Sequence, residues 1–321
     1  MSRFKKIAFL FPGQGAQYPG MGKDFFQTFP QAKAVFEEAD DILKRKLSTI
    51  ILEGPEATLT ETRNSQTGIY VTSVAILRVL ASLFPNLKPS FCSGLSLGEY
   101  TALHASNRIS FEDCLNLVNY RSQFMNDACE RTKGTMAVII GLDSDAVEKL
   151  VKDVNMPNDL WAANFNCPGQ VVISGTMKGI EAGSEAAKAK GAKRVLPLPV
   201  HGAFHSGLMA EAERQLAPHI QESNLQDSLI GFVMNVPGKI VNDKEEIREN
   251  LRRQVTQSVR WEQGIEEMDN HGVDLYIEIG CGKALAGFNK RIGVKGTTVN
   301  LETIKDLEIL EKTLSSEVMS G

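Results

Sequence analysis

The stretch from Gly94 to Gly98 (GLSLG) has the pattern G-x-S-x-G, which is typical of a nucleophilic serine on a sharp turn between a strand and a helix. A serine in such a turn has a strained backbone, so its neighbours two positions away must be small, and both are glycine. The first free N–H groups of the helix would point to where an oxyanion forms. The pattern therefore predicts that Ser96 is a nucleophile. A glycine-rich turn that needs only tight packing is the alternative.

A nucleophilic serine needs a base, and two of the five histidines stand where one could lie. His201 and His205 come where a strand end meets the start of a predicted helix over residues 207–222. An imidazole in that position can reach a serine on a neighbouring turn. A structural role is the alternative for both. His219 and His271 lie near helix ends beside polar residues, and we expect them to be solvated.

Arg121 is the third group that could take part in chemistry, because it lies within an apolar stripe on a predicted helix. The helix opens at a capping pattern from Ser110 to Asp113 (SFED). An arginine cannot lose its proton, so a buried one needs an anion. That anion is either an Asp or Glu of the chain, in a salt bridge, or the carboxylate or phosphate of a ligand.

These side chains must be positioned by a sheet. Residues 6–11 (KIAFLF) are an apolar run typical of a strand buried on both faces of a parallel sheet, and residues 88–93 predict the strand before Ser96. The glycine-rich loop 12–17 follows the first strand, at the sheet edge where ligands bind in open α/β folds. It is either a plain turn or a source of backbone N–H groups for a substrate. The loop lacks G-x-G-x-x-G, which argues against a nicotinamide site.

The middle of the chain has a different order of predicted strands and helices. Residues 134–200 predict the order strand, helix, strand, strand, helix, strand, which is typical of a ferredoxin-like arrangement. We therefore expect an α/β fold in which residues 133–198 form a small subdomain inserted into a large domain of residues 1–132 and 199–321. Predicted strands of the insert cover residues 135–141, 160–165, 170–175 and 193–197, with helices over 144–154 and 178–190. Further helices are predicted over residues 31–47, 66–83, 97–105 and most of 250–261, with strands over 230–236 and 274–280.

Composition limits the classes of function. The chain has 321 residues, of which 42% are hydrophobic, and a net charge of −4. Mild acidity without a Lys/Arg cluster argues against a nucleic-acid partner. The five cysteines lack metal-ligand spacing, which predicts reduced thiols and no metal site. The apolar run near Met1 is too short for a signal peptide, and no apolar stretch is long enough to span a bilayer. We therefore expect a soluble, cytoplasmic protein without a membrane partner.

Taken together, these landmarks resemble the malonyl-CoA:acyl-carrier-protein transacylases, in the family's order and over nearly the whole chain. The shared motifs begin with Phe11-Pro-Gly-Gln-Gly-Ala-Gln17, Gly94-Leu-Ser-Leu-Gly-Glu-Tyr100 and Tyr120-Arg-Ser-Gln-Phe-Met125. They continue with Asn166-Cys-Pro-Gly-Gln-Val-Val-Ile-Ser-Gly175, Phe204-His-Ser-Gly-Leu-Met209 and Ile277-Glu-Ile-Gly-Cys-Gly-Lys283. The resemblance implies an α/β-hydrolase-like domain with a ferredoxin-like insert, transfer of malonyl from malonyl-CoA to an acyl carrier protein, no cofactor, and a monomer.

The resemblance also implies roles by position. Ser96 would be the nucleophile and His205 its base, while Arg121 would hold the free carboxylate of malonyl. The backbone N–H groups of Gln14 and Leu97 would form the oxyanion hole. Gln254 would orient His205 through its backbone carbonyl. Phe204 and Asn166 would contact the substrate.

The sequence departs from the family pattern at two positions. The family usually has histidine before the serine, where this chain has Leu95, a variant that resembles the free-standing acyltransferases of polyketide assembly lines. The signature His-Ala-Phe-His of malonyl-selective domains begins here with Gly202.

Three other functions stay open. An acyl hydrolase of this fold would lack the selective arginine, and a generic serine esterase would place an acid between serine and histidine. A non-enzymatic carrier-docking module would not need an elbow serine and a histidine together.

Overall fold

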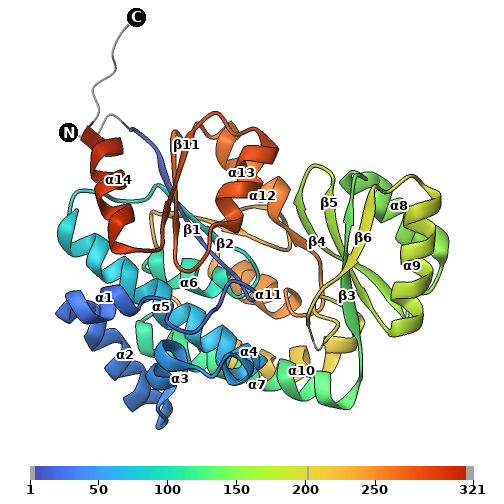
Figure 1. Ribbon diagram of the computed structural model, residues 1–321, viewed down its shortest axis with the longest axis horizontal. Helices are drawn as coiled ribbons and strands as arrows, with labels where there is room; N and C mark the ends of the chain where they lie inside the picture. Colours follow the sequence, from blue (N-terminus) through green and yellow to red (C-terminus); the bar gives the residue numbers. More distant parts are fainter. Residues whose placement is uncertain (1–3, 201, 316–321) are drawn as a thin grey trace, which may run out of the picture.

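The fold has two sheets side by side, and the chain passes from the larger sheet to the smaller one and back twice (Figure 1). The computed structural model describes residues 4–200 and 202–315. The larger sheet has six strands in the order β11-β10-β1-β2-β7-β8, all parallel except the β7–β8 pair. Its strands are β1 (Ile7–Phe11), β2 (Phe91–Gly94), β7 (Gly231–Met234), β8 (Lys239–Val241), β10 (Leu275–Ile279) and β11 (Thr297–Leu301).

Strand β1 is the centre of the core, and all five of its residues are buried. One hydrophobic cluster contains Ile7, Phe9 and Phe11 together with residues of helices α2 (Pro30–Leu43), α5 (Thr62–Leu83), α6 (Gly98–Ala105), α7 (Phe111–Arg131) and α10 (Ala210–Glu222). Ala8 and Leu10 face the other way, into a second cluster with α12 and α13. The sheet is therefore covered by helices on both faces, which explains the continuous apolar run that the sequence shows. The other helices around this sheet are α1 (Lys23–Thr28), α3 (Leu47–Glu53), α4 (Glu56–Thr60), α11 (Lys244–Arg253), α12 (Trp261–Asn270), α13 (Ala284–Ile292) and α14 (Ile304–Ser315).

Helix α5 (Thr62–Leu83) corrects one expectation of the sequence. Within the described residues it is the one helix whose length and composition would allow it to cross a membrane. Its most apolar window is 72% buried inside the fold. The apolar composition is therefore explained by packing against the sheet and the neighbouring helices.

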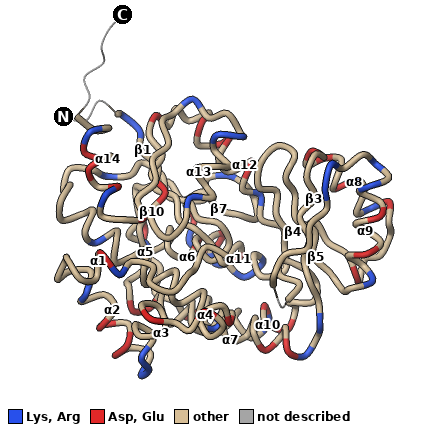
Figure 2. Tube along the Cα trace, in the orientation of Figure 1, with Lys and Arg blue, Asp and Glu red and all other residues tan. Residues whose placement is uncertain are grey.

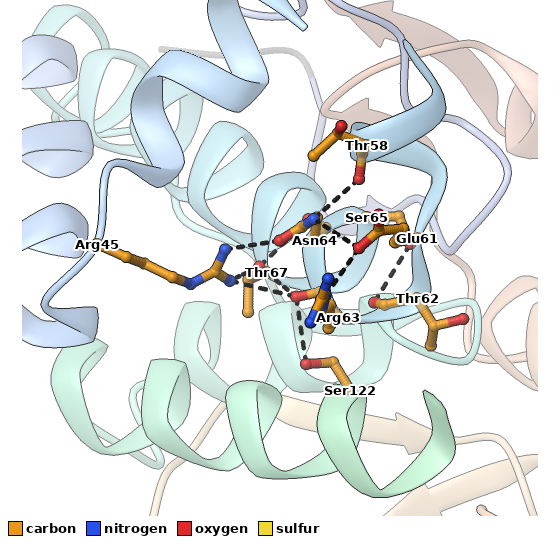
Figure 3. Close-up of polar contacts among 9 residues, drawn as sticks. All are labelled: Arg45, Thr58, Glu61, Thr62, Arg63, Asn64, Ser65, Thr67 and Ser122. Atoms are coloured by element: carbon orange, nitrogen blue, oxygen red, sulfur yellow. Dashed lines mark hydrogen bonds and ion pairs between the residues drawn. The ribbon is translucent and has the colours of Figure 1, made fainter. Parts of the chain in front are cut away.

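The start of α5 is held by a group of polar side chains (Figure 3). The guanidinium of Arg45 donates to Asn64 Oδ1 at 2.6 Å and to Thr67 Oγ1 at 3.2 Å. From the neighbouring helix α7, Ser122 Oγ donates to the carbonyl oxygen of Arg63 at 3.4 Å. These bonds fix the first turns of α5 against the segment after α2 and against α7. The next turn carries Gln66, which reaches the site described below.

The second sheet carries the predicted order strand, helix, strand, strand, helix, strand, and that prediction is confirmed. Strands β3, β4, β5 and β6 are antiparallel to their neighbours, in the order β6-β3-β5-β4. Helices α8 and α9 cover the face away from the larger sheet (Figure 1). The elements are β3 (Thr135–Ile140), α8 (Ser144–Val154), β4 (Leu160–Cys167), β5 (Gln170–Gly175), α9 (Met177–Ala189) and β6 (Arg194–Pro197).

The prediction that residues 250–261 are mostly helical is wrong for their second half. Helix α11 ends at Arg253, and the chain then turns and forms β9 (Val259–Arg260), a fifth strand of the second sheet. Strand β9 pairs in parallel with β4. Lys and Arg alternate with Asp and Glu along the outer helices (Figure 2).

Candidate active site

The predicted turn around Ser96 is present, with β2 ending at Gly94 and α6 beginning at Gly98. Ser96 has φ 51°, a left-handed conformation that costs energy for any residue with a side chain. A Cβ atom at Gly94 would overlap the carbonyl of Gly98, and one at Gly98 would overlap the carbonyl of Phe11. Both glycines are therefore required by the close approach of strand, turn and helix.

Ser96 and His205 lie together although 109 residues separate them along the chain. Ser96 Oγ is 2.8 Å from His205 Nε2, and His205 Nδ1 is 2.7 Å from the carbonyl oxygen of Gln254. The imidazole is 3% exposed, and burial, with the charge of Arg121, lowers its pKa to about 4. A neutral imidazole that donates from Nδ1 to a carbonyl presents the lone pair of Nε2 to the serine, which is the state that a general base requires.

The other histidines have separate partners. Residue 201 lies outside the described residues. Nδ1 of His104 is 3.0 Å from the carbonyl oxygen of Ile109. His271 is exposed, as expected, whereas His219 is half-buried and stacks on Tyr120 with ring centroids 3.8 Å apart. The expectation that His219 is solvated therefore holds only in part, because the ring of Tyr120 on α7 covers one of its faces.

Arg121 reaches Ser96 from helix α7. The side chain is 1% exposed, and its Nη2 donates to Ser96 Oγ at 3.1 Å and to Gln254 Oε1 at 2.9 Å. Its Nη1 donates to Gln66 Oε1 at 2.5 Å. Burial lowers the pKa of Arg121, and no carboxylate of the described residues is among its hydrogen-bond partners. The intramolecular salt bridge considered from the sequence is therefore not formed, and the cation has only neutral partners.

A cavity of about 160 Å³ opens at Ser96 between the two sheets. From the larger part of the chain it is lined by Gly13, Gln14, Leu95, Ser96, Met125, Phe204 and His205. From the second sheet and the segment after it come Met136, Asn164, Asn166, Val172, Leu198 and Val200. Asn166 is 6% exposed, and its Oδ1 has no hydrogen-bond partner among the described residues, so the cavity wall carries an acceptor for a ligand.

The two residues expected to form the oxyanion hole lie on either side of the serine. Leu97 is buried and directly precedes helix α6, and Gln14 lines the cavity from the loop after β1. The side-chain amide of Gln14 contacts α5, with Nε2 3.4 Å from Thr62 Oγ1. The role of the two N–H groups stays a prediction.

Sequence reasoning missed Gln66, Glu99 and Asn235. Asn235 follows β7, and its Oδ1 accepts the N–H of Ser96 at 2.8 Å while its Nδ2 donates to the carbonyl of Gly94 at 2.8 Å. The signal available was the position of Asn235 at the carboxyl end of a predicted strand, next to the serine strand in the sheet. Gln66 and Glu99 carry no comparable signal, because each lies in a helix that is apolar on most sides.

A serine beside a neutral imidazole can take an acyl group from one carrier and pass it to another, and the buried cation beside them suits an acyl group that bears a negative charge. Fold and site together define the class as an acyltransferase. The sequence model described as "Acyl transferase domain" matches residues 8–289.

Relatives narrow the class. A malonyl CoA-acyl carrier protein transacylase of Bacillus subtilis (strain 168) is 41% identical over 97% of this chain and 98% of its own length. One of Haemophilus influenzae is 37% identical over 97% of this chain and 99% of its own. The chain therefore belongs to the malonyl CoA-acyl carrier protein transacylase family.

Solved structures agree with this assignment. The crystal structure of a malonyl CoA-acyl carrier protein transacylase from Clostridium perfringens has a TM-score of 0.91 and 36% identity, and the match covers 97% of each chain. A malonyl-transacylase in complex with a type II PKS acyl-carrier protein also has a TM-score of 0.91 and 36% identity, over 98% of this chain and 100% of that one. The mixed α/β architecture with two sheets is thus that of known malonyltransferases.

Proposed function

We propose that this chain transfers the malonyl group of malonyl-CoA to the phosphopantetheine thiol of an acyl carrier protein, through a malonyl ester on Ser96. One observation carries the proposal. Ser96 Oγ lies within hydrogen-bond distance of both His205 Nε2 and Arg121 Nη2 at the wall of one cavity. A nucleophile, its base and a cation for the free carboxylate therefore meet at one atom.

In the first half-reaction Ser96 Oγ attacks the thioester carbon, and its proton passes to His205 Nε2. The negative charge that develops on the carbonyl oxygen is received by the N–H groups of Gln14 and Leu97. The carbon–sulfur bond then breaks, and His205 returns the proton to the sulfur of coenzyme A. The carbonyl of Gln254 holds the Nδ1–H during both transfers, which keeps Nε2 directed at the serine.

The second half-reaction runs the same steps with the carrier thiol as nucleophile. His205 takes the thiol proton, the sulfur attacks the ester carbon, and the proton goes to Ser96 Oγ as the ester bond breaks. Serine and histidine supply all the proton transfers, so we propose that the reaction needs no metal and no cofactor.

Arg121 would select the acyl group. Gln66 and Gln254 accept one N–H from each of its terminal nitrogens. Nη1 keeps a second N–H, Nε has no hydrogen-bond partner among the described residues, and the second N–H of Nη2, which faces Ser96, would pass from the serine to a ligand. Two N–H groups on neighbouring nitrogens are the arrangement that a carboxylate binds with two parallel bonds. A malonyl group held at both ends would present its ester carbon in a fixed pose, which favours the carrier thiol over water.

Phe204 would restrict the space beside the α-carbon of the acyl group. It is 7% exposed and lines the cavity next to His205. We expect that Phe204→Ser raises the rate with methylmalonyl-CoA relative to malonyl-CoA. A methyl group in an apolar pocket is worth about 1–3 kcal/mol, so the gain should be about 10- to 200-fold at most. The measurement is a competition between the two thioesters, and an unchanged ratio would assign the selectivity to other residues.

The finer description of the fold is also a proposal. Residues 1–132 and 199–321 would form an α/β-hydrolase-like domain, and residues 133–198 a ferredoxin-like subdomain. The parallel strands and the order β6-β3-β5-β4 support these names. Strand β9 lies outside the proposed subdomain and extends its sheet, which ties the two parts together next to the cavity. We further propose a monomeric, cytoplasmic enzyme.

The test of the function is incubation with malonyl-CoA and a carrier protein that bears phosphopantetheine, followed by mass measurement of the carrier and assay of free malonate. We expect malonyl on the carrier and little free malonate. Release of malonate at the rate of coenzyme A release would favour the acyl-hydrolase alternative instead. An unmodified chain and carrier would favour a docking module.

A further inference from the structure

Glu99 is a buried acidic residue directly behind the serine to which the mechanism above gives no role. It lies in the first turn of α6, three residues after Ser96, and is 0% exposed. Its Oε1 accepts the backbone N–H of Asn235 at 2.6 Å, and its Oε2 accepts Gln254 Nε2 at 2.7 Å. Burial raises the pKa of Glu99 to about 8, although these donors and the charge of Arg121 oppose the shift. Because each oxygen faces a donor, the geometry suits the carboxylate, which only accepts.

The carboxylate fixes the orientation of the Gln254 amide. Gln254 Nε2 faces acceptors only: Oε2 of Glu99, the carbonyl oxygen of Ser96 at 2.8 Å and, at 3.2 Å, Asn235 Oδ1. Gln254 Oε1 on the other side accepts Arg121 Nη2 at 2.9 Å. Glutamine has one donor end and one acceptor end, so a reversed amide would lose the bonds on both sides. Glu99, Gln254 and Arg121 thus form a hydrogen-bond relay with a single direction.

The relay also places the carboxyl group of Glu99 near Arg121 without direct contact between the two side chains. A carboxylate in direct contact with the guanidinium would occupy the N–H groups that an acyl carboxylate needs. Glu99 instead acts through one intervening amide. When ionised, Glu99 raises the pKa of Arg121 from a distance, while the direct hydrogen-bond partners of the cation are neutral.

We propose that Glu99 is a positioning residue which holds Arg121 through Gln254 and thereby sets the preference of the enzyme for acyl groups with a free carboxylate. This inference rests on the proposed function. Replacement by glutamine keeps the shape and introduces an NH₂ group. The backbone N–H of Asn235 cannot move away, so the new oxygen stays on it and the new NH₂ faces Gln254 Nε2. Two donors then face each other, and the amide of Gln254 must turn away from Arg121 or reverse.

The test compares malonyl-serine and acetyl-serine formation from the two coenzyme A thioesters in the full-length chain. We expect Glu99→Gln to lower the ratio of malonyl to acetyl rates by about 10- to 100-fold, since a hydrogen bond to a charged group is lost or reversed. Acetyl-CoA shares Ser96 and His205 but lacks the carboxylate, so a general loss of structure cancels in the ratio. The matched control is Glu278→Gln, a fully buried glutamate that accepts N–H groups of Leu285 and Ala286 on α13. Its ratio should equal that of the wild type.

A second variant changes Gln254, the middle residue of the relay. It keeps the proposal testable if Glu99→Gln does not fold. Gln254→Met removes the side-chain amide but keeps the backbone carbonyl that contacts His205. We expect the same fall in the ratio, and no further fall in the double variant, because both changes break one relay. Equal losses for malonyl and acetyl in the variants, or losses that multiply in the double variant, would overturn the inference. If the wild type acylates normally and the ratios stay unchanged, this inference alone fails. If the wild type forms no malonyl-serine, the proposed function fails with it.

Discussion

Arg121→Ala is expected to lose most of the malonyl-transfer rate while its serine stays reactive. The guanidinium is almost fully shielded from water, where a charge pair with the malonyl carboxylate is strong and its loss is costly. Removing one partner of a shielded pair costs about 3–5 kcal/mol, which is roughly two to three and a half orders of magnitude in rate. Acetyl-CoA has no carboxylate, so its rate should hold or rise once the cation is gone. The measurement is acyl-serine formation from each thioester.

Arg108→Ala is the matched control for this experiment. Arg108 is also an arginine of the large domain with 1% exposure, and it donates to the carbonyl oxygen of Ile230 at 3.0 Å and to Asn242 Oδ1 at 3.2 Å. Its loss should lower stability and leave the ratio of malonyl to acetyl rates unchanged. Arg121→Lys should resemble the alanine variant more than the wild type, because an ammonium cannot form the two parallel bonds. Equal losses with malonyl and acetyl in Arg121→Ala would make Arg121 a structural residue.

The elbow at Ser96 could be predicted because its signal is local. Two glycines, a serine with positive φ and the flanking apolar strand all lie within a few residues. Strand β5 and helix α8 have the bounds that the sequence predicts, for the same reason. Contacts between residues far apart in the sequence leave no such local signal. The choice of His205 over His201 came from family resemblance, since the two histidines lie in equivalent local surroundings.

The polar residues behind the site could not be predicted from local pattern. Asn235 bonds to a backbone N–H that is 139 residues away, and Gln254 bonds to Glu99 over 155 residues. Nothing in the spacing of these residues brings them together, because the contact depends on the order of strands in the sheet. The prediction of helix after Arg253 was wrong for a related reason. The short strand at the end of this segment, Val259–Arg260, depends on pairing with β4, which comes from a distant part of the chain.

The central claim is that a malonyl group is carried on Ser96. Ser96→Ala should keep the fold, because the methyl group fits where the Cβ already lies, and should form no covalent adduct at all. His205→Ala keeps the hydroxyl and serves as the control. It should still acylate, slower by about two to four orders of magnitude, which is the range of general-base catalysis.

The most direct measurement is the intact mass of the chain after brief incubation with malonyl-CoA and removal of excess thioester. The account predicts one added malonyl group on the wild type, located by peptide mapping on the segment that contains Ser96, and none on Ser96→Ala. A malonyl adduct that persists on Ser96→Ala would contradict it and place the nucleophile elsewhere.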